Sequence, residues 1–236
     1  MMYCLLCNTS IQYQLGWLQF LEGLLNQPLC SECEQQFQFI VGELCAICGR
    51  PLSELAPEYI CKTNCLDCVR WETDTEYAGV LDKNRSVYTY NNWMKEVMKR
   101  FKFRGDAAIA SLFAERMRRC LQASFTAKSL LIPIPLSPER LYERGFNQAQ
   151  LLAGQIDHPC IEVLVRTHSE KQSKKSRLER MQMKTIFQVS NHQVIMNQNI
   201  VLIDDIYTTG ATIRQAAKAL KEGGARSVSS LTLCRG

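Results

Sequence analysis

The sequence predicts an α/β fold, a mainly parallel sheet flanked by helices, with a small cysteine-rich module in front of it. Residues 200–203 form a continuous apolar run, the pattern of a strand buried on both faces of a parallel sheet, and a helical pattern follows from Ile213. Residues 130–135 read as a second strand, ended by prolines. Nine of the twelve cysteines lie within the first 68 residues. We therefore expect a cysteine-rich module at residues 1–75 and an α/β domain at residues 76–236.

The cysteine-rich module contains four C-x-x-C pairs. Each pair can present two sulfur atoms to one ion, and two pairs complete the tetrahedral Cys4 shell that structural zinc prefers. The spacing is close to that of zinc ribbons and predicts two zinc sites, one for each consecutive pair of pairs. The predicted ligands are Cys4, Cys7, Cys30 and Cys33 at the first site and Cys45, Cys48, Cys65 and Cys68 at the second.

Cys61 competes for the second site, because Cys61-x3-Cys65 also places two thiols near one ion. Cys65 and Cys68 repeat the C-x-x-C unit, so Cys61 is expected to be a spare thiol. Disulfides or buried free thiols are the alternative, and they lose support because nothing routes the chain to an oxidising compartment. Closed Cys4 sites are structural and leave no open position for catalysis.

Charge is divided unevenly along the chain. Residues 1–75 contain three basic and nine acidic side chains, a formal charge of −6, whereas residues 76–236 have a formal charge of +11. Zinc thiolate centres add negative charge, so we expect the cysteine-rich module to fold and dock rather than to bind nucleic acid. Its apolar stretch at residues 15–25 is expected to be core, with a partner-binding helix as the alternative.

Membrane insertion and export are not expected. No apolar run approaches the roughly 18 residues of a transmembrane helix. The start of the sequence has no basic segment ahead of an apolar one, so it does not resemble a signal peptide. Reduced cysteines are consistent with a cytoplasmic protein.

The segment from residue 76 to 198 alternates predicted strands and helices. We expect a strand at 87–90, helices at 92–103 and 107–122, the strand at 130–135 and a helix that begins near Ala149. Helix 92–103 interleaves basic with aromatic residues, a combination that can bind single-stranded nucleic acid. A solvated basic face over an aromatic core explains the same pattern and is favoured.

Two basic segments follow the predicted strands. Arg140 and Arg144 come after the strand at 130–135 and could hold pyrophosphate oxygens by charge-assisted hydrogen bonds, or be surface charges on a loop. Residues 166–184 contain seven lysines and arginines. That run is typical of a mobile solvated loop, but it could also close over an anionic ligand or contact nucleic acid.

Asp204 and Asp205, here called the acidic pair, mark the candidate site. They are expected at the carboxyl end of a strand, where open α/β sheets bind ligands. Two adjacent carboxylates repel each other unless a diol, a cation or both hold them. The following loop, residues 208–212, is rich in threonine around Gly210, which tolerates positive φ and close approach of a ligand.

A helix is predicted directly after this loop. Ile213, Ala216, Ala217 and Leu220 recur at helical spacing, and Gly223-Gly224 supplies the stop. The free N–H groups and the positive dipole end of such a helix suit a phosphate. The alternative is an ordinary strand, turn and helix capped by Thr208 or Thr209. Neither the P-loop motif nor the dinucleotide motif is present.

Residues 201–212, Val-Leu-Ile-Asp-Asp-Ile-Tyr-Thr-Thr-Gly-Ala-Thr, resemble the phosphoribosyl pyrophosphate (PRPP) binding signature of type I phosphoribosyltransferases. The resemblance implies that the acidic pair holds the ribose 2′ and 3′ hydroxyls. It also implies Mg²⁺ bound with PRPP, and a 5′-phosphate site made by Thr208, Thr209, Gly210, Ala211 and Thr212.

A second resemblance spans nearly the whole chain. Residues 45–51, 102–106, 133–136 and 140–148, followed by the signature above, occur in the order found in ComF-type competence proteins. This implies a zinc module on a phosphoribosyltransferase-like domain and a role in natural transformation. Incoming single-stranded DNA and proteins of DNA uptake and recombination are the partners it implies.

Two functions are compatible with these residues. The first is a competence protein that acts on or with single-stranded DNA and has a PRPP-binding domain. The second is an active phosphoribosyltransferase with an unknown acceptor and no direct DNA contact. There the acidic pair would position the ribose, and Arg140, Arg144, Mg²⁺ and the 166–184 loop would stabilise the leaving pyrophosphate.

Overall fold

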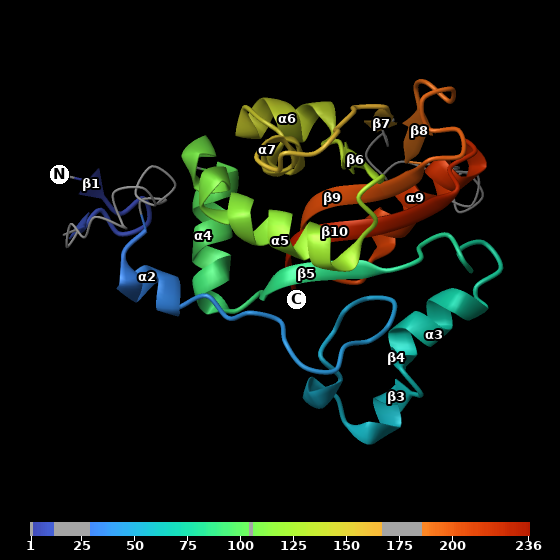
Figure 1. Cartoon of the computed structure of the whole chain (residues 1–236), viewed down its shortest axis with the longest axis horizontal. Helices are drawn as coiled ribbons and strands as arrows, with labels where there is room; N and C mark the ends of the chain where they lie inside the picture. Colours follow the sequence, from blue (N-terminus) through green and yellow to red (C-terminus); the bar gives the residue numbers. More distant parts are fainter. Residues whose placement is uncertain (1, 12–28, 104–105, 167–185) are drawn as a thin grey trace, which may run out of the picture.

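The structure is a computed structural model that describes residues 2–11, 29–103, 106–166 and 186–236 (Figure 1). The predicted apolar stretch at 15–25 and nearly all of the 166–184 segment lie outside these residues. Across the described residues, no helix is long and apolar enough to cross a membrane.

A four-stranded parallel sheet forms the centre of the molecule. Its order is β5-β10-β9-β6, and every neighbouring pair is parallel. The predicted α/β class with a mainly parallel sheet is therefore confirmed. The strands are β5 (Asn84–Thr89), β6 (Leu130–Pro133), β9 (Asn199–Tyr207) and β10 (Ser227–Arg235).

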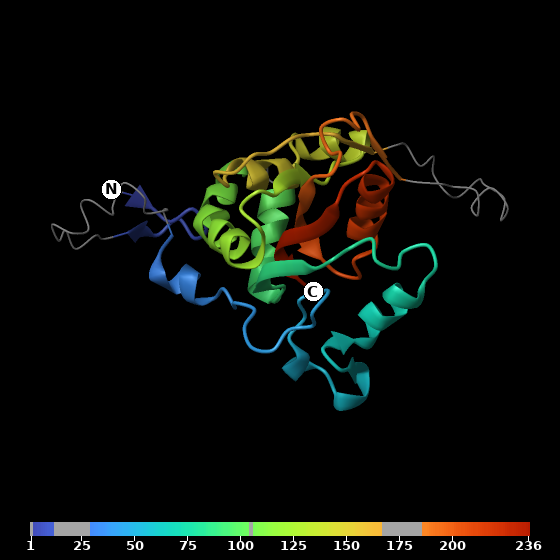
Figure 2. The same ribbon diagram turned by 45° about the vertical axis from the view of Figure 1, so that its right-hand side comes forward.

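Helices cover both faces of this sheet (Figure 2). One face packs Val201, Ile203 and Leu231 against the helical segments between β5 and β7. The other packs Ile200, Leu202 and Val228 against the last helix. Odd and even residues of β9 thus reach opposite cores, as strand alternation requires. The helices are α4 (Asn92–Phe103), α5 (Ala114–Ser124) and α7 (Gln148–Gly154) on the first face and α9 (Ala211–Glu222) on the second.

The helix predicted at 107–122 is divided into two parts. A 3-10 helix, η3 (Ala107–Phe113), precedes α5. Ile109 with Leu112, and Ala110 with Phe113, are buried pairs three residues apart, which is the period of a 3-10 helix. The predicted α-helix is therefore wrong for residues 107–113 and right for the following segment.

The cysteine-rich residues contact the two faces of the sheet separately. β1 (Met2–Tyr3), β2 (Ser10–Ile11) and α2 (Ser31–Gln35) lie beside α4, and Cys4 and Cys33 belong to the core on that face. Cys45, Cys48 and Cys68 belong to the core on the opposite face. That second part comprises η1 (Leu52–Glu54), η2 (Pro57–Tyr59), β3 (Ile60–Cys61), β4 (Asn64–Cys65) and α3 (Leu66–Thr73).

A buried polar network attaches the second cysteine-rich part to β5. Asn84 is fully buried and donates from Nδ2 to the Cys48 carbonyl oxygen at 3.1 Å. Its Oδ1 accepts from Ser230 Oγ at 2.9 Å, which ties the same side chain to β10. The division at residue 75 stays a prediction, because residues on both sides of it share each core.

Two short strands bound the basic segment. β7 (Leu164–Arg166) and β8 (Phe187–Val189) pair antiparallel in a sheet of their own. The basic segment that begins at Arg166 therefore follows an antiparallel pair outside the four parallel strands.

Candidate functional site

The acidic pair lies where one neighbouring strand has ended and the other continues. β6 pairs with β9 only as far as Pro133 opposite Ile203, whereas β10 follows β9 to Tyr207. The strand was expected to end at Ile203, but it includes both aspartates. The site therefore opens on the β6 side of the strand end.

The two aspartates of the acidic pair have different electrostatic surroundings. Asp205 is buried on the side of α4, and its Oδ2 forms an ion pair with Lys102 Nζ at 2.6 Å. The Asp205 amide donates to Asp204 Oδ1 at 2.8 Å. Burial, followed by the charge of Asp205, raises the pKa of Asp204 to about 7. Near neutral pH, Asp204 is therefore poised to lose a proton when a cation or a diol arrives.

A 260 Å³ cavity adjoins the acidic pair, and four cationic side chains line it. Lys102 comes from α4, Arg140 and Arg144 come from the helix α6 (Pro138–Arg144), and Arg166 comes from β7. Burial, followed by the neighbouring charge of Arg140, lowers the pKa of Arg166. The four cations suit a polyanion, and the two carboxylates suit a ligand that also brings a diol or a bound cation.

Arg140 and Arg144 lie on a helix, α6 (Pro138–Arg144), that is not predicted. Ser137 caps it by accepting from the Arg140 amide at 3.4 Å, Pro138 begins it, and Gly145 ends it at φ 76°. These residue types commonly begin and end helices, so the sequence contained the signals from which this helix could have been predicted. Because the two arginines are four residues apart, one helix face presents both to the cavity.

Gln148 completes this side of the cavity. Its side chain is buried, and its Oε1 accepts from Arg144 Nη1 at 2.8 Å. Its Nε2 has no hydrogen-bond partner among the described residues. A buried unpaired donor at a cavity is satisfied when a ligand supplies an oxygen.

The threonine-rich loop forms the opposite wall. Gly210 has φ 81° and is the N-cap of α9, so neither threonine holds the cap position expected in the ordinary strand-turn-helix alternative. Thr209 Oγ1 accepts from the Ala211 amide at 3.3 Å. Among the described residues, nothing accepts from the amides of Thr212 and Ile213. Both residues line a small cavity of 30 Å³ that Asp204 also lines, and free amides at the start of a helix suit a phosphate oxygen.

The cysteines assemble into two tetrads. The four sulfur atoms of Cys4, Cys7, Cys30 and Cys33, the first tetrad, lie within 4.8 Å of one another, as do those of the second tetrad, Cys45, Cys48, Cys65 and Cys68. Cys61 is exposed and belongs to neither. Both groups could hold a metal ion.

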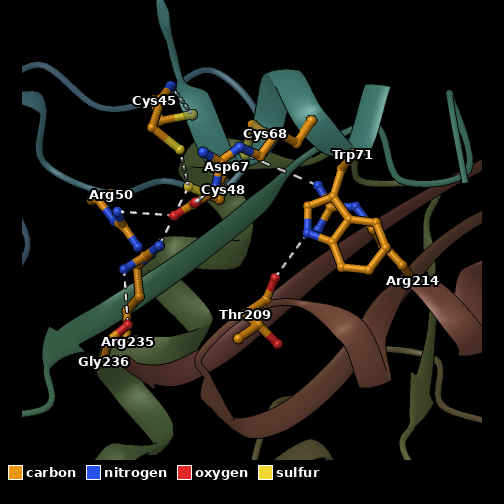
Figure 3. A network of polar contacts seen from close by, with 12 residues as sticks. Cys45, Cys48, Arg50, Asp67, Cys68, Trp71, Thr209, Arg214, Arg235 and Gly236 are labelled. Carbon is orange, nitrogen blue, oxygen red and sulfur yellow. Dashed lines mark hydrogen bonds and ion pairs between the residues drawn. The ribbon is translucent and has the colours of Figure 1, made fainter. Parts of the chain in front are cut away.

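The second tetrad fits a metal–thiolate centre on charge as well as on geometry. Its cysteines are all buried, and it lies against two buried arginines, Arg214 and Arg235 (Figure 3). Among the described residues, no Asp or Glu carboxylate lies within 4.0 Å of either guanidinium. A divalent ion bound by four thiolates would have a formal charge of about −2 and would supply a counter-charge to these arginines.

Two of the residues that form the site, Lys102 and Gln148, are absent from the individually named sequence-based candidates. Lys102 lies in a helix far from the loop along the chain, and only the fold brings it to Asp205. Gln148 is an uncharged residue, whereas Arg166 begins the basic 166–184 run that was expected beside the pyrophosphate. The 102–106 segment was singled out by resemblance, but nothing in its composition indicated an ion pair with the acidic pair.

Comparison with known proteins assigns the chain to a family. The phosphoribosyl transferase domain family matches residues 142–236, which contain α7, β9, the loop and β10. The chain is 44% identical to the competence protein ComFC of Bacillus subtilis over 98% of this chain and 94% of that one. It is 34% identical to ComFC of Streptococcus pneumoniae over 99% of this chain and all of that one.

A more distant relative has a different name. The DNA utilization protein YhgH of Salmonella typhimurium is 25% identical over 90% of this chain and 92% of that one. The two ComFC proteins align with this chain from the cysteine tetrads to β10. Their identities of 44% and 34% are too high to be explained by a shared fold alone. The chain belongs to the ComFC family of competence proteins and contains a phosphoribosyltransferase-like domain.

Proposed function

We propose that this protein acts in natural transformation, on or with incoming single-stranded DNA, and that its α/β domain binds PRPP. The relatives named for competence and DNA utilization support the biological role. The cavity beside the acidic pair supports the ligand, because four cations, two carboxylates and an amide-lined loop meet there. That combination matches a molecule with a diol, a phosphate and a pyrophosphate.

The proposed roles follow the positions of the side chains. The acidic pair holds the ribose hydroxyls, and Thr208, Thr209, Gly210, Ala211 and Thr212 hold the 5′-phosphate. Arg140, Arg144, Lys102 and Arg166 face the pyrophosphate, with Gln148 donating to an oxygen. Mg²⁺ bound with PRPP would neutralise part of the pyrophosphate charge. Zinc in both tetrads would be structural.

The alternative is an active phosphoribosyltransferase without DNA contact. In that reaction, an acceptor lone pair forms a bond to C1 while the C1–O bond to pyrophosphate breaks, and the electron pair leaves with pyrophosphate. The crowded cations favour this step because they stabilise the charge on the leaving group. The same cations also suit binding without reaction.

Calorimetry with Mg²⁺-PRPP and with single-stranded DNA tests the proposal. Wild type should bind PRPP, and Asp204→Asn with Asp205→Asn should lose that binding while its circular dichroism is unchanged. Equal binding by both proteins would refute the ligand assignment.

DNA binding is measured separately at low and moderate salt. It should weaken steeply with salt, because it depends on the charge of the α/β domain, and should survive in the double variant. PRPP binding should depend more on Mg²⁺ than on salt. Failure to bind DNA, together with pyrophosphate release from PRPP, would favour the enzyme alternative.

A further inference from the structure

The second tetrad and the threonine-rich loop are joined by direct contacts (Figure 3). Trp71, on the helix that contains Cys68, donates from Nε1 to the Thr209 carbonyl oxygen at 3.1 Å. The guanidinium of Arg214 lies over the Trp71 ring, with 4.8 Å between its Cζ and the ring centroid. One loop residue and one residue of α9 thus contact the same side chain of the cysteine-rich part.

Arg214 connects the loop with the sulfur atoms. It is fully buried in the first turns of α9, and its backbone amide donates to the Gly210 carbonyl oxygen at 2.9 Å. Its Nη1 donates to the Tyr207 hydroxyl at 2.8 Å, while its Nη2 lies 4.0 Å from Cys68 Sγ. Its Nε has no partner among the described residues. Within the described part of the chain, no Asp or Glu carboxylate lies within 4.0 Å of this guanidinium, and the sulfur atoms of the second tetrad lie beside it.

Arg235 repeats the arrangement at the end of β10. It is 7% exposed, and its Nη2 lies 3.5 Å from Cys48 Sγ. Its guanidinium also lies over the Tyr207 ring, 5.5 Å from the centroid. Two buried cations thus flank Tyr207, the residue from which the loop departs, and both face the tetrad.

We infer that metal bound in the second tetrad is the counter-charge that keeps Arg214 in place and thereby holds the threonine-rich loop in its binding conformation. Metal occupancy and loop order are then coupled, so that loss of the ion loosens residues 207–214. Arg214 is a positioning residue, because it acts on the loop through Tyr207 and Gly210. Coupling to ligand affinity also requires the proposed PRPP site, whereas coupling to loop order does not.

The first tetrad provides a matched control. It lies on the opposite face of the sheet, beside α4. Arg100 of α4 links it to the α/β domain by donating from Nη2 to the Leu5 carbonyl oxygen at 2.8 Å, and the same guanidinium pairs with Asp106 at 3.0 Å. This arginine has a carboxylate partner, so the first tetrad is not needed to balance it.

The test compares Cys68→Ser with Cys33→Ser in the full chain, by metal analysis and by amide hydrogen exchange without PRPP. Each variant should lose one ion. Exchange in residues 207–214 should rise at least about fivefold in Cys68→Ser and stay within about twofold of wild type in Cys33→Ser. Equal effects of the two variants on this segment would overturn the inference.

If Cys68→Ser unfolds the whole sheet, a second variant tests the inference instead. Arg214→Met is made in the Cys33→Ser background, where only the second tetrad holds metal and its four thiols remain intact. Release of this ion to a chelator should be at least about fivefold faster than in Cys33→Ser, because the thiolates lose a neighbouring cation. An unchanged release rate would refute the coupling.

Ligand binding separates this inference from the proposed function. If PRPP binds, it should slow release of that same ion, since coupling between two sites is reciprocal. If wild type does not bind PRPP, the proposed ligand is wrong, and the exchange and release results still decide whether metal holds the loop. PRPP binding with no effect on release would contradict the inference alone.

Discussion

At the scale of single residues, Asp204 is costly to bury in its ionised form. Its pKa is raised to about 7, from an ordinary value of 3.8, because burial and the charge of Asp205 both disfavour ionisation. The folded protein therefore holds this proton more tightly than the unfolded chain does. Stability from this group is gained as pH falls through the folded pKa, and above that pH the buried charge destabilises the fold.

Asp204→Asn should therefore stabilise the ligand-free protein, and more at pH 8 than at pH 5. We expect the melting temperature to rise by at least about 2 °C at pH 8 and by clearly less at pH 5. Thermal unfolding at both pH values measures this difference. Asp157→Asn, at an exposed site, is the control for the charge change and should shift neither value. An equal rise at both pH values would argue against a raised pKa.

Lys102 neutralises the other aspartate, and the ion pair is largely shielded from water, with 17% and 12% of the two side chains exposed. Lys102→Met should lower the unfolding free energy by about 2 kcal/mol, because it leaves Asp205 without a counter-charge. It should also weaken Mg²⁺-PRPP binding. Urea unfolding and calorimetry measure the two effects. Lys99→Met, exposed on the same helix, should change stability by less than about 0.5 kcal/mol.

At the scale of elements, the turn between β9 and α9 depends on Gly210. A Cβ placed there would lie 2.2 Å from the Tyr207 hydroxyl and 2.5 Å from Arg214 Nη1, and φ is 81°. Gly210→Ala should destabilise the protein by about 1–3 kcal/mol and abolish PRPP binding, since the loop must move. Gly154→Ala, where nothing lies within 4 Å, is the control and should be neutral. Chemical unfolding compares the two; equal stability would show that the loop tolerates the rearrangement.

Prediction of the elements succeeded where one strong periodicity decided the outcome. The helix at 92–103 has the predicted bounds, because its apolar positions recur at helical spacing without competing turn residues. β10 was not predicted, since Ser229, Ser230 and Thr232 interrupt its apolar pattern. Ser230 and Thr232 are buried with hydrogen-bond partners that Asn84 and Ser86 supply, a match between distant strands that sequence periodicity does not reveal.

The site also contains some features that local sequence patterns predict and others that depend on distant contacts. Paired aspartates, the threonine-rich loop and the C-x-x-C pairs are local patterns, and the structure brings each into a cluster. The pairing of Lys102 with Asp205 and of Arg235 with Cys48 joins residues more than a hundred positions apart. Such contacts depend on strand order, so local sequence patterns could not predict them.

At the scale of the whole molecule, the two tetrads lie on different faces of one sheet. Metal analysis of the purified protein should return about two ions per chain, one for each tetrad. Titration with a thiol reagent should release them in two phases, the first tetrad earlier, because its Cys7 is exposed while all four cysteines of the second are buried. A single ion, or release in one phase, would contradict two independent centres.

Strand order has a further consequence for how the protein is made. β10 occupies an inner position between β5 and β9, although it is the last of the four strands in the chain. During synthesis, the backbone edges of β5 and β9 that pair with β10 stay unpaired until residues 227–235 leave the ribosome. Until then, Asn84 also lacks its hydrogen-bond partners on β10. The nascent chain therefore passes through an aggregation-prone interval, and its final strand completes the sheet, the buried polar network and the setting of Arg235 in one step.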